Sequence, residues 1–410
     1  MSPSRRTVLL GCAVGLAGAG SLGYRHRRRL RGRSDLEPIE RALDTEPPAV
    51  DPGPPVSLEH LEARFARVED AVDEAEAVRG ESLETHRTDY RELPPSALEN
   101  VTHAERRSAL ETYRYMLGVA YHTTASERYE RESGGDPGAL EDRLEDERER
   151  LASLEYEYRG DSLTETVVGT AAIDERHADA TRRVESPEPP FYGRTAYPRA
   201  WRFVGYAEAS RVDAERFLAN RDDGTEYEPE LETTHERLRE ATDELLAAVS
   251  WERDGTPTRA SDVDAIREMS RSTTRTLEDG YPALAVRRAS RRHTHARSLD
   301  ALEEVPGRED RDETGWTVDA GAVVDRKEAA IDAISRVLEE HGDDSLGVRL
   351  LATASRIVEE GDDELETLRA DVHELSDDEW NAAVEPAWLY YREAAVFADA
   401  IPETLALVAK

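Results

Sequence analysis

Apolar residues recur at alternating spacings of three and four along most of the chain between residues 57 and 409. The clearest stripe follows Ser57 and consists of Leu58, Leu61, Phe65, Val68, Val72 and Ala75. This spacing predicts an amphipathic helix that Ser57 caps and that packs in the manner of a coiled coil. Further stripes are Leu231, Leu238 and Leu245; Val324, Ile331, Ile334 and Leu338; and Ile357, Leu365, Leu368, Val372 and Leu375.

Proline and glycine interrupt these stripes at intervals. The breaks lie at Pro94-Pro95, Gly134 to Pro137, Pro187 to Pro198, Asp222 to Gly224, Asp254 to Pro257, Gly280 to Pro282, Pro306-Gly307 and Gly342. They predict roughly ten helices, and no convincing alternating run of β-branched residues predicts a strand. We therefore expect an all-α fold, either an elongated antiparallel helical bundle or an irregular helical stack, preceded by an N-terminal membrane segment and a proline-rich spacer.

The same pattern divides the chain into four parts. Residues 1–33 form a candidate signal or membrane anchor with a basic flank, and residues 34–56 hold six prolines mixed with acids. Such a composition indicates an extended, semi-rigid linker. The remaining chain divides into a first helical half over 57–186 and a second over 187–410, separated at a long loop candidate that ends at Pro198.

Charge is distributed very unevenly along the 410 residues. Residues 1–34 hold eight of the 54 basic residues and no acid, so 46 bases face 89 acids in the rest. That acidic body argues against nucleic-acid binding, which needs basic surface. The bases include only two lysines, Lys327 and Lys410, and there is no glutamine. This composition resembles that of proteins from salt-adapted archaea, in which concentrated salt screens the repulsion between carboxylates.

The amino terminus resembles a twin-arginine export signal. Arg5 and Arg6 follow Ser4, and the uncharged residues 7–24 come next. Eighteen such residues are at the lower limit for crossing a bilayer. The segment from Leu9 to Cys12 also resembles a lipobox, which would make Cys12 a lipid attachment point, although only five residues separate it from Arg6.

The sequence does not decide on which side of the membrane the helical body lies. Six arginines follow the apolar segment and two precede it. The positive-inside rule would then keep the body in the cytoplasm, whereas an export signal would place it on the extracellular face. We expect a protein anchored to the cell membrane, with lipid contacted through the N-terminal segment and the body exported.

No common nucleotide, hydrolase, zinc-protease or calcium motif occurs, so no cofactor is expected and no functional family is recognised. The most specific enzymatic hypothesis is a metal site. An acid and a histidine three residues apart lie on the same face of a helix, where both can bind one metal ion. Asp174 with His177 and Glu232 with His235 have this spacing. A hydrogen-bonded histidine at the edge of an apolar stripe is the alternative explanation of His235.

One basic segment stands out in the acidic body. It contains Arg287, Arg288, Arg291, Arg292 and His295. Arginines four residues apart on a helix repel each other unless a negative charge lies nearby. Either neighbouring acidic helices neutralise them, or they bind an anion, a lipid headgroup or a partner protein.

These features together favour a non-catalytic helical protein that binds or scaffolds a partner at the cell envelope. A helical metal-dependent enzyme or ligand carrier that uses the acid–histidine pairs is one alternative. A membrane adaptor that faces the cytoplasm is another.

Replacing both Arg5 and Arg6 by Lys should block export, because twin-arginine translocation requires the paired arginines. Protease accessibility of the body in intact cells measures this. Unchanged surface delivery of the double variant would contradict the export signal.

Overall fold

The computed structural model describes residues 36–51, 53–81, 83, 90–131, 134–187, 193–221, 224–248, 260–302, 318–371 and 377–410. The predicted export signal at Arg5 and Arg6, the apolar segment and Cys12 lie outside these residues. No helix in the described ranges is both long enough and apolar enough to cross a membrane.

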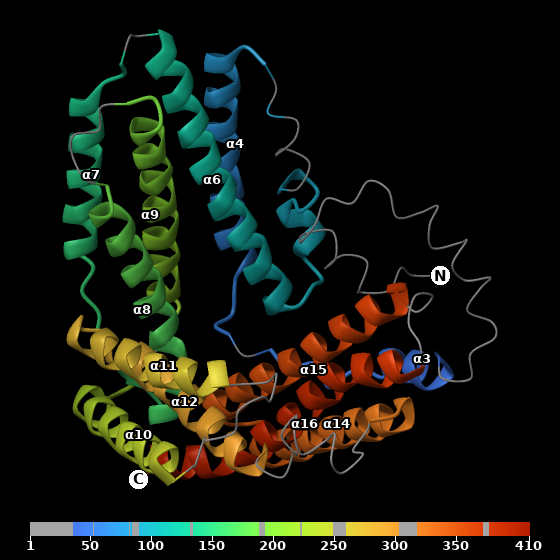
Figure 1. Ribbon diagram of the computed structural model, residues 1–410. Helices are drawn as coiled ribbons and strands as arrows, with labels where there is room; N and C mark the ends of the chain where they lie inside the picture. Colours follow the sequence, from blue (N-terminus) through green and yellow to red (C-terminus); the bar gives the residue numbers. More distant parts are fainter. Residues whose placement is uncertain are drawn as a thin grey trace.

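The all-α prediction is confirmed, and the helices form two groups (Figure 1). The first, which we call the N-terminal bundle, contains α4 (Leu58–Arg79), α6 (His103–Arg131), α7 (Pro137–Ala152), α8 (Leu163–Glu185) and α9 (Ala196–Ala219). The second, the C-terminal bundle, contains α3 (Leu36–Asp44), α10 (Glu228–Ala248), α11 (Ala260–Glu278), α12 (Pro282–Leu302), α14 (Ala320–His341), α15 (Ser345–Asp371) and α16 (Asp377–Val408). Twelve α-helices thus fall within the described residues, against the ten or so expected.

Short elements join the helices. A 3-10 turn, η3 (Pro95–Leu98), lies at the predicted Pro94-Pro95 break. Two strands of two residues each, β1 (Arg159–Gly160) and β2 (Thr225–Glu226), pair antiparallel. In the sequence, β1 comes just before α8 and β2 just before α10. This pairing therefore brings together the segment before a helix of the N-terminal bundle and the segment before a helix of the C-terminal bundle.

Helix α4 follows the sequence pattern closely. The Ser57 hydroxyl accepts a hydrogen bond from the backbone N–H of His60 at 3.1 Å, which satisfies one of the free donors of the first turn. Gly80 ends the helix in the left-handed conformation, with φ of 81°. Leu61, Val68 and Val72 are all buried, as the stripe predicts.

Two glycines set the distance between α6 and α9. A Cβ atom built on Gly205 would lie 3.0 Å from the Cα of Gly118, and one on Gly118 would lie 2.3 Å from the ring of Tyr206. The backbones therefore approach each other more closely than any larger side chain would permit. This close approach is part of the extensive packing between α6 and α9.

Helix α8 belongs to both bundles. Val167 and Val168 in its first half pack in the large core formed with α12, α14, α15 and α16. Ile173 belongs to the core cluster formed by residues of α4, α6 and α9, and Val184 near the end of α8 packs with α7 and α9. One helix therefore connects the apolar cores of the two groups.

The interior of the N-terminal bundle also contains ionised groups. Asp213 is only 1% exposed and pairs with His60 Nε2 at 2.9 Å and with Arg64 Nη2 at 2.6 Å. Burial alone would raise the pKa of Asp213, but Arg64 and His60 outweigh it and hold that pKa well below its usual range. Arg67 donates to Glu208 at 2.7 Å and helps to lower the pKa of Glu208 to about 2 against the effect of burial.

Part of the predicted linker is helical. Residues 36–44 form α3, which packs against α14 and α15, and Ile39 and Leu43 are buried in the core of the C-terminal bundle. The expectation of an extended spacer is therefore wrong for these residues. Ile39 and Leu43 are four residues apart, so they present one apolar face that tertiary contacts stabilise.

Packing also divides the described helices differently from the proposed halves. Helix α9 begins after the division at 186/187, yet it packs against α6, α7 and α8. The change from one bundle to the other follows α9, near residue 220. The long loop candidate before Pro198 therefore connects helices of a single bundle.

Lys327, one of the two lysines, fixes α3 to the C-terminal bundle. It is fully buried, and its Nζ donates to the carbonyl oxygen of Ala42 at 2.6 Å and to Asp362 Oδ1 at 2.6 Å. The Tyr391 hydroxyl donates to the same carboxylate oxygen at 2.6 Å. Helices α3, α14, α15 and α16 thus meet at a single buried ion pair.

We expect Lys327→Met to lower the free energy of unfolding by about 3–5 kcal/mol, because Asp362 would remain buried without its cation. Adding Asp362→Asn should recover part of this loss, since it removes the uncompensated charge. Denaturant unfolding measures both effects, and Lys410→Met, at an exposed position, is the matched control. Equal stability of Lys327→Met and the control would contradict the role of the ion pair.

Candidate functional site

The five residues of the basic segment do not face one environment. Arg292 is 1% exposed, and it donates to the carbonyl oxygen of Ile266 at 2.9 Å and to Asp243 at 2.7 Å. Arg288 donates to the Thr276 hydroxyl at 2.8 Å. These two arginines join α12 to α10 and α11 and are used in packing.

His295 faces another neighbour, α16. Its ring stands edge-on to Phe397 with centroids 4.7 Å apart, and its Nδ1 lies 3.7 Å from Glu393. The histidine therefore belongs to the contact between α12 and α16.

Arg287 and Arg291 point toward the place where α8, α12 and α15 meet. Arg287 pairs with Glu175 of α8 at 2.9 Å. Arg291 interacts electrostatically with Arg356 and Glu360 of α15, and Arg349 of the same helix interacts with Arg287 and Arg291. We call Arg287, Arg291, Arg349 and Arg356 the arginine cluster.

The arginine cluster contains more positive than negative charge. Its carboxylate neighbours are Glu175 and Glu360, and the latter pairs with Arg356 at 3.7 Å. Among the described residues, neither Arg291 nor Arg349 has a hydrogen-bond or ion-pair partner, and the Nε atom of Arg291 is buried. Four guanidinium groups therefore share two carboxylates.

The pKa values follow from this imbalance. Burial and then the charge of Arg287 lower the pKa of Arg349 to about 10, and Glu175 limits this fall. Burial and then Arg356 also lower the pKa of Arg291. For Glu175, burial alone would raise the pKa, but Arg287 outweighs burial and holds it below its ordinary value. Each positive charge here would be stabilised by an additional anion.

Sequence analysis identified only two of the four arginines of the cluster, Arg287 and Arg291. Arg349 and Arg356 are seven residues apart and lie on one face of α15, but nothing in a chain with 54 basic residues distinguishes them. Only the packing of α15 and α12 around α8 brings them to Arg287 and Arg291.

Asp174, a candidate metal ligand, is fully buried between the bundles. It accepts hydrogen bonds from the hydroxyl of Tyr156 at 2.9 Å and from the backbone N–H of Leu284 at 2.9 Å. The single hydroxyl proton of Tyr158 is shared between Asp174, at 3.3 Å, and the carbonyl oxygen of Gly280, at 3.1 Å. Leu284 lies in the first turn of α12, so the carboxylate caps that helix from α8. Burial raises the pKa of Asp174 to about 6, and these hydrogen bonds limit the rise.

His177 has protein partners on both ring nitrogens. Its Nδ1 lies 2.9 Å from the Tyr281 hydroxyl, and its Nε2 lies 3.2 Å from the carbonyl oxygen of Leu151. Asp174 and His177 are thus held in a cluster of tyrosines at the junction of the bundles.

The second acid–histidine pair, on α10, is split between two environments. Glu232 is exposed, whereas His235 is 2% exposed and its buried Nε2 has no hydrogen-bond partner among the described residues. Burial, and then Arg239, lower the pKa of His235. Over the described part of the chain, no three His, Cys, Asp or Glu side chains form a group suited to a metal ion.

Residues 224–410 match the family model described as Domain of unknown function (DUF8264). No curated protein and no solved structure matches the chain. This agrees with the sequence, whose motifs resemble no functional family. The matched range begins where the N-terminal bundle ends, and it contains every arginine of the arginine cluster but not Glu175.

We expect the stability contributed by Asp174 to fall as the pH rises from about 4 to about 6. Its pKa in the folded chain is raised, so the folded state holds a proton there that the unfolded state has lost. Relative to Asp174→Asn, the wild-type free energy of unfolding should decrease over this range by up to about 3 kcal/mol.

Denaturant unfolding at a series of pH values measures this difference. Asp332→Asn, at an exposed position on α14, is the control and should show no such trend. A wild-type advantage that grows with pH would contradict the raised pKa.

Proposed function

We propose that the chain is a non-catalytic helical binding or scaffolding protein, anchored by its N-terminal segment to the membrane of a salt-adapted archaeon. Its helical body would lie on the extracellular face and bind an anionic group at the arginine cluster. The resemblance of residues 4–10 to a twin-arginine signal and the acidic composition support the location. The arginine cluster supports the binding role.

The single observation that carries this proposal is that Arg291 and Arg349 have no hydrogen-bond or ion-pair partner among the described residues of a chain with 89 acids. The buried arginines Arg64, Arg211 and Arg292 each contact a carboxylate. Arg106 and Arg237 have no carboxylate partner among the described residues either, but they donate to backbone carbonyls. Arg291 and Arg349, in contrast, donate to no described acceptor. The arrangement lowers the stability of the ligand-free protein and favours a bound anion.

The chemistry of the site selects oxyanions. A guanidinium is planar and presents paired N–H donors that fit a phosphate or a carboxylate. Arg291 and Arg349 belong to different helices, so a single anion between them would also tie α12 to α15. Such a group would be a free phosphate or a phosphate or carboxylate carried by a partner.

Inorganic phosphate should raise the melting temperature of the wild-type protein above that in chloride at equal ionic strength. At a phosphate concentration ten times the dissociation constant, the expected gain is about 1.4 kcal/mol. Arg349→Met should abolish this gain. Without phosphate, the variant should equal the wild type or exceed it in stability by about 1 kcal/mol, because an unpaired charge is removed.

The control is Arg336→Met, which removes an exposed arginine paired with Asp399 and should keep the full response to phosphate. Phosphate also stabilises proteins generally by exclusion from their surfaces. That effect would appear equally in all three proteins. An equal response of wild type and Arg349→Met would therefore contradict the proposed site.

A further inference from the structure

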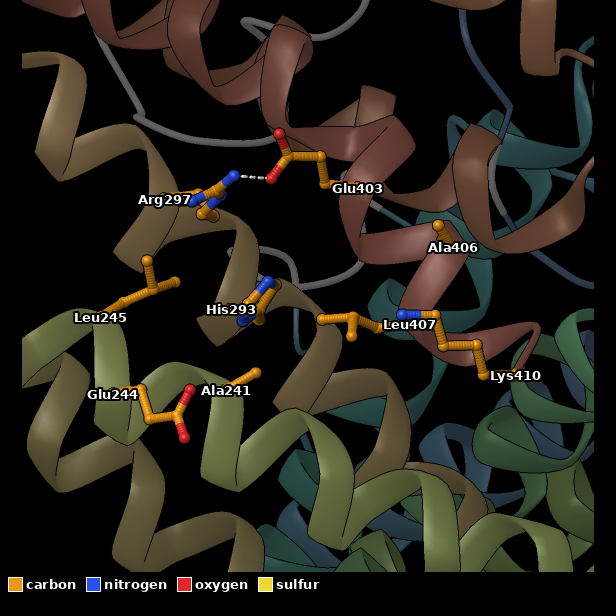
Figure 2. Close-up of a pocket in the computed structure, with 9 residues that line it drawn as sticks. All are labelled: Ala241, Glu244, Leu245, His293, Arg297, Glu403, Ala406, Leu407 and Lys410. Atoms are coloured by element: carbon orange, nitrogen blue, oxygen red, sulfur yellow. Dashed lines mark hydrogen bonds and ion pairs between the residues drawn. The ribbon is translucent and has the colours of Figure 1, made fainter.

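A cavity of about 490 Å³ lies between α10, α12 and α16, away from the arginine cluster (Figure 2). Its walls include the apolar side chains Leu245 of α10 and Leu407 of α16, and the imidazole of His293 of α12. This size and mixed lining are typical of sites for small molecules. The cavity lies entirely within the range that matches the family model.

The hydrogen bonds around His293 define its tautomer. The hydroxyl of Thr242 donates to the carbonyl oxygen of Leu238 at 2.5 Å, and this uses its only proton. At 3.2 Å from the same hydroxyl, His293 Nδ1 must therefore be the donor. A neutral ring with its proton on Nδ1 has a lone pair on Nε2.

His293 is also neutral near pH 7. Burial and then the charges of Arg297 and Arg292 lower its pKa to about 4. Over the described residues, Nε2 has no hydrogen-bond partner. It is therefore an unused acceptor among the side chains that line the cavity.

The charged side chains at the cavity balance one another. Arg297 and Glu403 form an ion pair across it, from α12 to α16 (Figure 2). Glu244 and Lys410 supply one further charge of each sign. A charged ligand would gain little from this set, whereas a neutral ligand would leave the ion pair intact.

We propose that this cavity binds a small neutral molecule with an apolar body and one hydroxyl or N–H group, which donates a hydrogen bond to Nε2 of His293. Leu245 and Leu407 contact the apolar body. Thr242 is a positioning residue, because it keeps the proton on Nδ1 and the lone pair on Nε2. This binding is independent of anion binding at the arginine cluster.

The test compares indole, which has an N–H donor, with indene, which has nearly the same shape and no donor. Calorimetric or NMR titration of the full chain gives an affinity for each. In His293→Phe, the ratio of indole to indene affinity should fall by about 2- to 10-fold relative to wild type, because one hydrogen bond is lost. Using the ratio removes differences in hydrophobicity between the two probes.

Two further variants locate the site. Leu245→Trp should abolish binding of both probes by filling the cavity. Thr242→Val should lower the ratio less than His293→Phe, because the histidine remains but either tautomer can form. His122→Phe, on α6 and outside the cavity, is the control and should keep the wild-type ratio.

An unchanged ratio in folded His293→Phe would overturn the proposal. So would the failure of wild type to bind either probe, or binding that persists in Leu245→Trp. Circular dichroism confirms that each variant is folded. If His293→Phe does not fold, the ratio in Thr242→Val decides, and an unchanged ratio there counts against the proposal.

Discussion

The described structure depends on the packing of α8 with both bundles. Its first half contributes Val167 and Val168 to the core of the C-terminal bundle, and its second half contributes Val184 to the N-terminal one. Between them, Asp174 caps α12 from inside the junction. Helix α8 thus provides both the apolar contacts to each bundle and the carboxylate that caps α12. The two bundles are therefore joined by a continuous packed interior rather than by a flexible connection.

Pairing between arginines and carboxylates is the second constraint, and it is incomplete at the arginine cluster. In the N-terminal bundle, buried pairs such as Arg64 with Asp213 are accompanied by further hydrogen bonds. A paired guanidinium can lie inside a protein, whereas an isolated charge there is costly. At the arginine cluster this pairing is incomplete, which separates a candidate binding surface from purely structural ion pairs elsewhere in the described chain.

Regular features were predictable from sequence because they depend on neighbours along the chain. The cap at Ser57, the stripe of α4 and the start of α12 at Pro282 follow from local chemistry, and all three are observed. The stripe over 231–245 likewise lies within α10, and the stripe that begins at Ile357 lies within α15 as far as Leu368. Its last two members, Val372 and Leu375, lie outside the described residues. Local patterns were sufficient for the fold class.

Features that depend on contacts between distant segments were not predictable. Helix α3 was hidden by the prolines and acids around it, since its apolar face gains stability only against α14 and α15. The placement of α9 was missed because a long loop does not reveal which helices it connects. For the arginine cluster, sequence spacing identified Arg287 and Arg291 but not Arg349, which lies on another helix. The cavity at His293 and the hydrogen bond between His293 and Thr242 depend on contacts between helices, which the sequence does not show.

If the proposed N-terminal anchor lies in a membrane, the docked position of α3 limits how far the body can stand from that membrane. If residues 7–24 were embedded in lipid, only residues 25–35 would remain before α3 begins at Leu36. Eleven residues reach at most about 40 Å even when fully stretched. The edge of the C-terminal bundle beside α3 would then stay near the headgroups.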